Sequence, residues 1–251
     1  MKLNHPIKKI KLSLKAITKI KNWWDYFGDY FGLKKGEIVY RINNKKIKTR
    51  AKTIDKSIFT EVALEELYFP EWLNLKEGVT IIDAGAHIGT FSVLINTKTK
   101  NAKVYSIEPN KDNYKILVEQ TKLNHDDIRA FNIALSDKEG KMKLYGGNHS
   151  ARCSLLRKEG KDYEFITTMS LKQFFDKNKI KKCDLLKMDI EGGEYPVLYS
   201  TPKKVFDKMQ RIFIEIHNIK GESRGDLIKF IKKMGFKVHY VEEDFVYAIK
   251  N

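Results

Sequence analysis

The chain has 251 residues, 42% of them hydrophobic and 12% aromatic, so it is long enough and apolar enough to bury a sizeable core, which excludes a disordered protein. Its only two cysteines, Cys153 and Cys183, exclude a disulfide framework and a C-x-x-C zinc site, and they favour a reducing, cytoplasmic compartment. The net charge of +16 requires nucleic-acid and membrane-surface partners to be considered.

The positive charge is concentrated at the N-terminus. Residues 1–50 hold 12 Lys and 2 Arg against three acids, a net charge of +11, which leaves +5 of the total +16 for the rest. We therefore divide the chain into a basic extension, residues 1–50, and a catalytic domain, residues 51–251. Apolar residues at helical spacing, followed by an aromatic cluster, predict an amphipathic helix in the extension. They are Ile7, Ile10, Leu14, Ile17 and Trp24.

Two interpretations of this helix stay open. It can pack on the body or on a second copy of the chain, with its lysines in solvent. Alternatively, residues 1–35 can lie at an anionic membrane surface. No apolar run reaches the roughly 18 residues that a membrane-spanning helix needs. We therefore expect a cytoplasmic protein, with peripheral membrane association as the open alternative.

Strand-like and helix-like segments alternate after the extension. Residues 37–48 predict a hairpin around Asn43–Asn44, a pair that favours turns. The expected strands are residues 79–83, 104–108, 128–135, 183–190, 212–216, 238–241 and 245–249. The expected helices are residues 90–95, 113–123, 171–175, 195–209 and 226–234. This order predicts an α/β fold with a doubly wound, mostly parallel sheet. Three residues separate the last two strands, so one of these strands must run antiparallel.

A loop with two glycines follows the first of these strands. Gly85 and Gly89 permit a tight turn and a close approach of ligand to backbone, where a doubly wound sheet binds its ligands. The dinucleotide pattern G-x-G-x-x-G lacks its middle glycine here, and the acid Asp83 would repel a pyrophosphate. The loop therefore favours a positively charged nucleoside. Glu108, at the end of the next strand, can accept hydrogen bonds from a ribose diol or merely cap a surface helix.

Four segments together resemble the motifs of FkbM-type class I S-adenosylmethionine-dependent methyltransferases. They are residues 82–89, 106–110, 132–140 and 184–194, and the last carries the specific pattern K-x-D-x-E-G-x-E. The resemblance spans about residues 55–220. It implies a Rossmann-like, seven-stranded sheet, S-adenosyl-L-methionine as cofactor, and O-methylation of a hydroxyl on a glycan, polyketide or related small metabolite.

The resemblance also implies roles for particular residues. Glu108 would hold the ribose, and Asn132 and Ala134 would border the adenine. Glu61 and Tyr68 are either residues that close over the cofactor or ordinary helix residues. The residues implied to line the methionine part of the cofactor are Asp83, Gly85, Ala86, His87 and Gly89.

Acidic residues and a histidine follow the fourth and fifth strands. A sugar or alkyl hydroxyl is a poor nucleophile, so a base should help to remove its proton. His217 is the natural base because its ordinary pKa is near 6.5, with Asp189 and Glu191 beside it as further catalytic candidates. Lys187 and Glu194 are expected to bind the acceptor. The alternative is a buried ion-pair cluster without function, and the spacing demands no metal ion.

Two other functions stay open at this stage. The pI of about 9.5 and the Lys/Asp/Glu set would suit an RNA ribose methyltransferase. A binding module that kept the fold and lost the chemistry is the other alternative. The mildly basic body and the lack of a recognisable RNA-binding module make nucleic acid the weaker partner.

Overall fold

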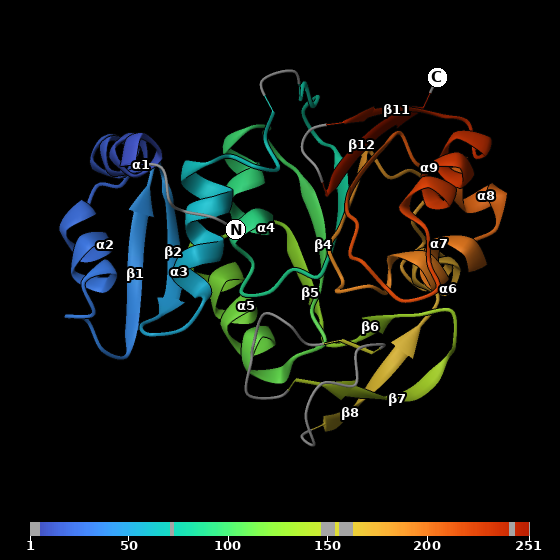
Figure 1. Cartoon of the computed structure of the whole chain (residues 1–251), viewed down its shortest axis with the longest axis horizontal. Coiled ribbons are helices and arrows are strands. Elements are labelled where there is room, and N and C mark those ends of the chain that lie inside the picture. The colour runs from blue at the N-terminus through green and yellow to red at the C-terminus, as the bar shows by residue number, and fades with distance from the viewer. Residues whose placement is uncertain (1–5, 71–72, 147–153, 156–162, 241–243, 251) are drawn as a thin grey trace.

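The computed structural model describes residues 6–70, 73–146, 154–155, 163–240 and 244–250 (Figure 1). Two helices open the chain, α1 (Pro6–Lys19) and α2 (Trp23–Tyr30). The predicted amphipathic helix is present as α1, but it ends before Trp24. Both helices lie at one end of the long axis of the molecule (Figure 1).

The predicted apolar row of α1 does not face the body. The buried residues of α1 and its C-terminal end are Ala16 and Ile20, and Leu12 packs partly against the same cluster. These three residues also recur at intervals of four, so periodicity alone could not decide which of two apolar faces turns inward. The outward row consists of Ile10, Leu14 and Ile17, whose exposed fractions are 60%, 58% and 45%.

The predicted hairpin is confirmed. Strands β1 (Glu37–Ile42) and β2 (Lys45–Arg50) pair antiparallel around Asn43–Asn44. Tyr40 is fully buried, and its ring centroid lies 4.6 Å from that of Phe59. The hairpin and α1 therefore share one hydrophobic cluster with the body of the protein.

Helix α5 (Lys111–Asn124) covers the free edge of β2. The Gln120 amide exchanges two hydrogen bonds with the backbone of Lys48, at 2.9 and 3.1 Å. The Asn124 amide does the same with Lys46, at 2.8 Å in each direction. These side chains satisfy backbone groups that would otherwise offer an unpaired strand edge.

The central sheet has seven strands in the order β11-β12-β10-β9-β3-β4-β5, which confirms the predicted architecture. All pairs are parallel except those of β12, which runs antiparallel to β10 and β11. The strand order reverses between β3 and β9, which places a ligand-binding crevice at their carboxyl ends. The strands are β3 (Thr80–Ala84), β4 (Lys103–Ile107), β5 (Ile128–Phe131), β9 (Leu185–Met188), β10 (Arg211–Glu215), β11 (Phe236–Tyr240) and β12 (Phe245–Lys250).

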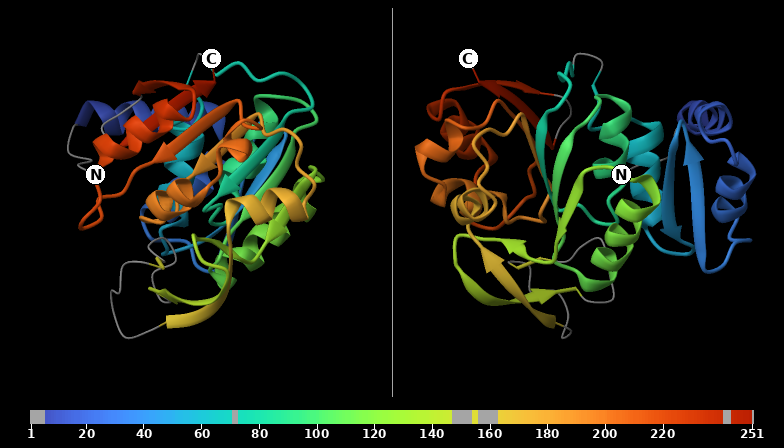
Figure 2. Two further views of the ribbon diagram at one scale, coloured as in Figure 1. Left: turned by 90° about the vertical axis from the view of Figure 1, so that its right-hand side faces the viewer. Right: turned by 180° about the vertical axis from the view of Figure 1, so that it is seen from behind.

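Alternation along the strands builds one core on each face of the sheet. In β3, Ile81 points into a cluster shared with the N-terminal helices, and Ile82 points into a second cluster on the opposite face. Figure 2 shows the helices on both faces. The first face carries α3 (Asp55–Phe59), a π-helical turn (Thr60–Leu64) and α4 (Thr90–Leu94), which a 3-10 turn (Ile95–Thr97) extends. The second carries α6 (Leu171–Lys177), α7 (Glu194–Ser200), α8 (Lys203–Phe206) and α9 (Arg224–Lys233). None of the described helices is long and apolar enough to cross a bilayer.

The expected strand at 128–135 is wrong in its extent. Strand β5 ends at Phe131, because Asn132 turns its side-chain amide onto the carbonyl oxygens of Glu108 and Pro109, at 2.9 and 2.8 Å. Ala134 and Leu135 form the short strand β6 of another sheet, with β7 and β8 in the order β6-β8-β7. The strands β7 (Gly140–Tyr145) and β8 (Tyr163–Met169) were not predicted.

Candidate active site

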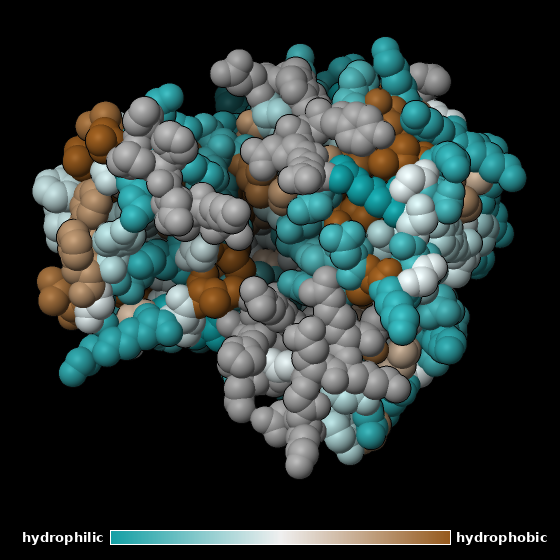
Figure 3. Space-filling model, in the orientation of Figure 1, coloured by the Kyte–Doolittle hydropathy of each residue, from teal (hydrophilic) through white to brown (hydrophobic). Residues whose placement is uncertain are grey.

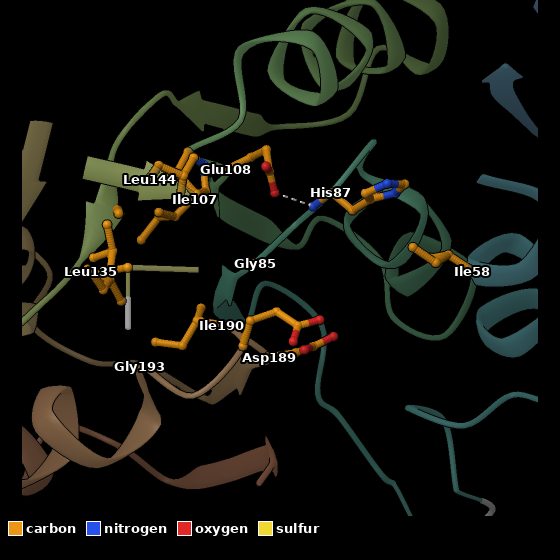
Figure 4. Close-up of a pocket in the computed structure, with 14 residues that line it drawn as sticks. Ile58, Gly85, His87, Ile107, Glu108, Leu135, Leu144, Asp189, Ile190 and Gly193 are labelled. Carbon is orange, nitrogen blue, oxygen red and sulfur yellow. Dashed lines mark hydrogen bonds between the residues drawn. The ribbon is translucent and has the colours of Figure 1, made fainter. Parts of the chain in front are cut away.

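A cavity opens at the carboxyl ends of β3, β4 and β9, where the strand order reverses (Figure 4). The hollow, including its open mouth, holds about 700 Å³. Gly85 forms its floor between Glu108 on one side and Asp189 on the other (Figure 4). The remaining wall is mainly apolar and includes Ile58, Ile107, Ala134, Leu135, Leu144 and Ile190.

Gly85 is required by its own neighbours. Its φ is +78°, a left-handed conformation that glycine adopts without strain. A Cβ added there would stand 1.7 Å from the carbonyl oxygen of Asp189. The glycine thus lets the loop after β9 cross directly over the loop after β3, so the two loops form one surface.

Asp83 lies behind this floor and does not line the cavity. It is fully buried, with Lys187 Nζ 3.2 Å from its Oδ1 and Ser92 Oγ donating to its Oδ2 at 2.5 Å. Lys187 also donates to the carbonyl oxygen of Gly85 at 2.8 Å. The nearby carboxylates raise the pKa of Lys187 against the effect of its burial. The charge of Asp83 is therefore neutralised inside the protein, and the negative charge at the cavity comes from other acids.

Glu108 presents a buried carboxyl group to the cavity. Its Oε2 accepts the backbone N–H of His87 at 2.8 Å (Figure 4), and its Oε1 accepts that of Asn110 at 2.9 Å. Burial raises the pKa of Glu108 to about 7, against these hydrogen bonds. Oε1 also accepts the side-chain amide of Asn113 at 3.4 Å, which leaves the second lone pair of Oε2 to accept a hydrogen bond from a ligand. Asn132 does not line the cavity, and its amide instead ties the ends of β4 and β5 together.

His87 lines the cavity as an uncharged ring. Burial lowers its pKa to about 4, although the Asp55 carboxylate, 3.5 Å from Nε2, acts in the opposite direction. Within the described part of the chain neither ring nitrogen meets hydrogen-bond geometry. Both nitrogens are buried polar atoms that a bound ligand could satisfy. Ala86 and Gly89 lie in the same loop without lining the cavity, and Gly89, at φ +86°, begins α4 against Leu117.

The loop after β9 holds acids around His217. Glu194 is fully buried, and its Oε1 accepts the backbone N–H of Ile190 at 2.9 Å and contacts His217 Nδ1 at 3.1 Å. His217 Nε2 lies 3.5 Å from Glu191 Oε2 and 3.9 Å from Asp189 Oδ1. Asp189 and Glu191 line the cavity, whereas Lys187 and Glu194 stand behind its wall.

His217 is charged at neutral pH. Burial opposes the charge, but Glu194, Asp189 and Glu191 raise the pKa of His217 to about 9. The raised pKa opposes the role of base expected for His217, and that role stays a prediction. The physical reason is that two carboxylates from the loop after β9, Asp189 and Glu191, and one from the start of α7, Glu194, surround the ring, an arrangement that strand alternation did not predict. Glu191, at φ +54°, has already left the strand geometry.

Tyr68 joins Asp189 to a residue that the sequence analysis did not select. Its hydroxyl lies 3.1 Å from Asp189 Oδ2 and 3.3 Å from Glu215 Oε2. Burial and Asp189 raise the pKa of Glu215 to about 8. One hydroxyl has one proton, so it can donate to only one of the two carboxyl groups. Its place in the sequence could have identified Glu215 as a site residue, because it is the last residue of β10 and lies two residues before His217.

Glu61 lies in the π-helical turn and lines a second cavity, between α1, α2 and this turn, rather than the first. Burial, with Glu65 and Asp189, raises its pKa to about 7. Tyr68, although buried against Phe91 and Phe213, also does not line the first cavity. Among the described residues, no group of three His, Cys, Asp or Glu side chains is arranged to hold a metal ion.

The cavity has the chemistry that S-adenosylmethionine requires. Its apolar wall suits an adenine ring, and the acceptor oxygens of Glu108 suit ribose hydroxyls. Asp189 and Glu191 put negative charge on the side opposite Glu108, which favours a cation over a pyrophosphate. The side chains present therefore fit this cofactor.

Comparison with known proteins also identifies methyltransferases as relatives of this chain. The profile of the family described as Methyltransferase FkbM domain matches residues 83–238. Methyltransferase sdnD of Sordaria araneosa is 26% identical over 76% of this chain and 84% of its own length. The 31-O-demethyl-FK506 methyltransferase FkbM of Streptomyces tacrolimicus is 22% identical over 76% of this chain and 85% of its own length. Hexuronic acid methyltransferase AglP of Haloferax volcanii is 24% identical over 68% of this chain and 70% of its own length.

A solved structure shares the fold. Magnesium protoporphyrin IX methyltransferase (ChlM) from Synechocystis PCC 6803, with bound SAM, superposes with a TM-score of 0.50 at 12% identity. The superposition covers 94% of this chain and 97% of that chain. Since the family profile spans more than half of the chain and the cavity fits the cofactor, this protein belongs to the FkbM family of S-adenosylmethionine-dependent methyltransferases.

Proposed function

We propose that this methyltransferase acts on a hydroxyl group of a glycan, a polyketide or a related small metabolite. The observation that carries the proposal is the pairing of Asp189, a carboxylate that lines the cavity, with the charged imidazole of His217. A hydroxyl needs help to lose its proton, and this pair can supply it. The names of two relatives, a 31-O-demethyl-FK506 methyltransferase and a hexuronic acid methyltransferase, support an oxygen acceptor on such molecules.

Residues on both sides of the cavity would hold the cofactor. Glu108 would accept the ribose hydroxyls, Ala134 and the apolar wall would contact the adenine, and Gly85 and His87 would line the path between them. Bound S-adenosylmethionine supplies an electrophilic methyl group. Asp83, Ala86 and Gly89 shape the loop from behind, and Asn132 fixes the strand end that carries Glu108.

Asp189 is the group we assign to the acceptor proton. His217 already carries a proton at neutral pH and cannot take another, whereas Asp189 lines the cavity with its Oδ1 3.9 Å from the imidazole. The carboxylate can orient the acceptor hydroxyl and take its proton as the new C–O bond forms.

Positioning residues hold Asp189 in place. Tyr68 contacts its Oδ2, and the buried Lys187 lies 3.8 Å from the same atom. Glu194 ties His217 to the backbone of Ile190, and so to the loop that carries Asp189. The expected direct contact of Lys187 and Glu194 with acceptor is thus replaced in our proposal by positioning, because neither side chain reaches the cavity.

The test is methyl transfer to a panel of acceptors. The protein is incubated with S-adenosylmethionine and with a free hexuronic acid, a hydroxylated polyketide, a primary amine and an RNA oligonucleotide. We expect a mass gain of one methyl group on a hydroxyl acceptor, with the carbon shift of an O-methyl group. Transfer to the amine or the RNA alone would refute the proposed acceptor class.

The roles of His217 and Asp189 have a pH signature. We expect activity to fall as the pH rises through about 9, where His217 loses its proton. Asp189→Asn should remove turnover while most cofactor binding persists, because Glu191 keeps a negative charge at the cavity. His239→Gln, which changes an exposed histidine on β11, is the matched control for His217→Gln. Activity that instead rises up to pH 9 would make His217 the base and contradict our assignment.

A further inference from the structure

The outward row of α1 is an unexplained apolar surface. Ile10, Leu14 and Ile17 point away from the body, and no described residue covers them; we call them the outward α1 face. In Figure 3 hydrophobic side chains gather at the left-hand edge of the molecule, where α1 and α2 lie. Trp24 and Phe31 on the α2 side are 57% and 68% exposed. Single exposed apolar residues are ordinary, but a helical row beside exposed aromatics marks an interaction surface.

Lysines surround this surface, and they differ in what they contact. Lys8 and Lys19 pair with Glu65 and Glu66 of the body, at 3.0 and 2.7 Å. These pairs fix the helix with its outward face exposed. Among the described residues, no acid pairs with the exposed side chains of Lys11 and Lys21. Free ammonium groups therefore border the apolar row.

A partner for this surface must offer apolar groups and negative charge together. A second copy of the chain would bring the net charge of +11 on residues 1–50 against the same charge. Nucleic acid offers phosphates but no apolar layer for three aliphatic side chains. A bilayer with anionic headgroups offers both, and tryptophan and tyrosine favour its interface.

We propose that α1 and the start of α2 dock on an anionic lipid surface. The outward α1 face enters the region between the headgroups, Trp24 lies at their level, and Lys11 and Lys21 contact the lipid phosphates. The ion pairs of Lys8 and Lys19 hold the body against the helix, so docking orients the whole methyltransferase. This proposal does not depend on which acceptor the enzyme methylates.

The test is cosedimentation of the full chain with vesicles. We use phosphatidylcholine alone and an equal mixture of phosphatidylcholine and phosphatidylserine. We expect binding only to the mixture, weakened by salt and weakened about fivefold for each of Lys11→Gln and Lys21→Gln. Lys229→Gln, an exposed lysine on α9, should change nothing. Loss of the outward face in the triple variant I10Q/L14Q/I17Q should abolish binding.

Controls separate docking from damage and from self-association. Phe165→Gln removes an apolar side chain that is also 58% exposed, on β8, and should bind like the wild-type protein. Brominated lipids should quench the wild-type fluorescence, and Trp24→Phe should remove most of that quenching, a readout that does not need the triple variant. The proposal is overturned if the wild-type chain stays in the supernatant with both vesicle types. Unchanged binding in the triple variant, or a dimer dissociated by it, would overturn it equally.

Discussion

The contact between the two site loops makes Gly85→Ala the most informative single substitution. A Cβ at Gly85 would lie 1.7 Å from the Asp189 carbonyl oxygen, where at least 3.0 Å is needed, so the loops must part by 1.3 Å or more. Holding an alanine at the left-handed φ of +78° destabilises the folded protein by about 1–2 kcal/mol. The extra methyl group between the two loops destabilises the folded protein by typically about 1–3 kcal/mol more. We expect a total destabilisation of about 2–5 kcal/mol.

Gly78→Ala is the matched control. Gly78 has a φ of +73°, but nothing lies within 4 Å of its added Cβ. Gly78→Ala should therefore be destabilised only by the strained backbone conformation, not by a steric clash. The assay is thermal unfolding together with calorimetric titration of S-adenosylmethionine. Each 1 kcal/mol should lower the melting temperature by about 2–4 °C in a chain of this size. Only Gly85→Ala should also weaken cofactor binding, and equal effects of the two variants on stability and affinity would refute the reasoning.

Three further outcomes follow from buried charges and thiols. Lys187→Met leaves Asp83 buried without its partner, and we expect a loss of about 3–5 kcal/mol in denaturant unfolding; a loss below about 1 kcal/mol would mean that the ion pair does not matter. His217 has its pKa raised from 6.5 to about 9, so its contribution to stability is complete below pH 6.5 and disappears as the pH rises through about 9. The difference in unfolding free energy between the wild-type protein and His217→Gln, at most about 3 kcal/mol, should shrink over that window; a constant difference would contradict the raised pKa. Burial raises the pKa of Cys183 to about 12, so in a Cys153→Ser variant this thiol should react with iodoacetamide only after unfolding, and rapid labelling of the folded chain would show that the site is open.

The sheet was predictable because its strands are short apolar runs between turn residues. Ile81 and Ile82 each face a core, so β3 is apolar on both sides at these two positions, as a doubly covered parallel strand requires, and its one charged residue, Asp83, pairs with Lys187. The hairpin followed from Asn43–Asn44, and the antiparallel β12 from a connection too short for a crossover. The positions of Gly85, Glu108 and Asp189 at neighbouring strand ends followed from the parallel order alone.

What the sequence could not predict depends on contacts across the chain. The small sheet was missed because β7 is short and half exposed, with only Met142 and Leu144 as apolar residues between its lysines and Tyr145, so its alternation is weak. The charge of His217 depends on Glu194, which reaches it from the start of α7. The charge of Asp83 is balanced by Lys187, which lies 104 positions further along the chain, on the neighbouring strand β9. The inward face of α1 could not be chosen because two rows of apolar residues share that helix.

The proposed function depends on the cofactor binding in the cavity between Glu108 and Asp189. The most direct measurement is calorimetric titration of S-adenosylmethionine into the wild-type protein, Glu108→Ala, and the control His125→Ala, which changes an exposed residue after α5. We expect binding to the wild-type protein and to His125→Ala, and at least about tenfold weaker binding to Glu108→Ala because its hydrogen bonds to the ribose are lost. Equal affinity in all three proteins would place the cofactor elsewhere.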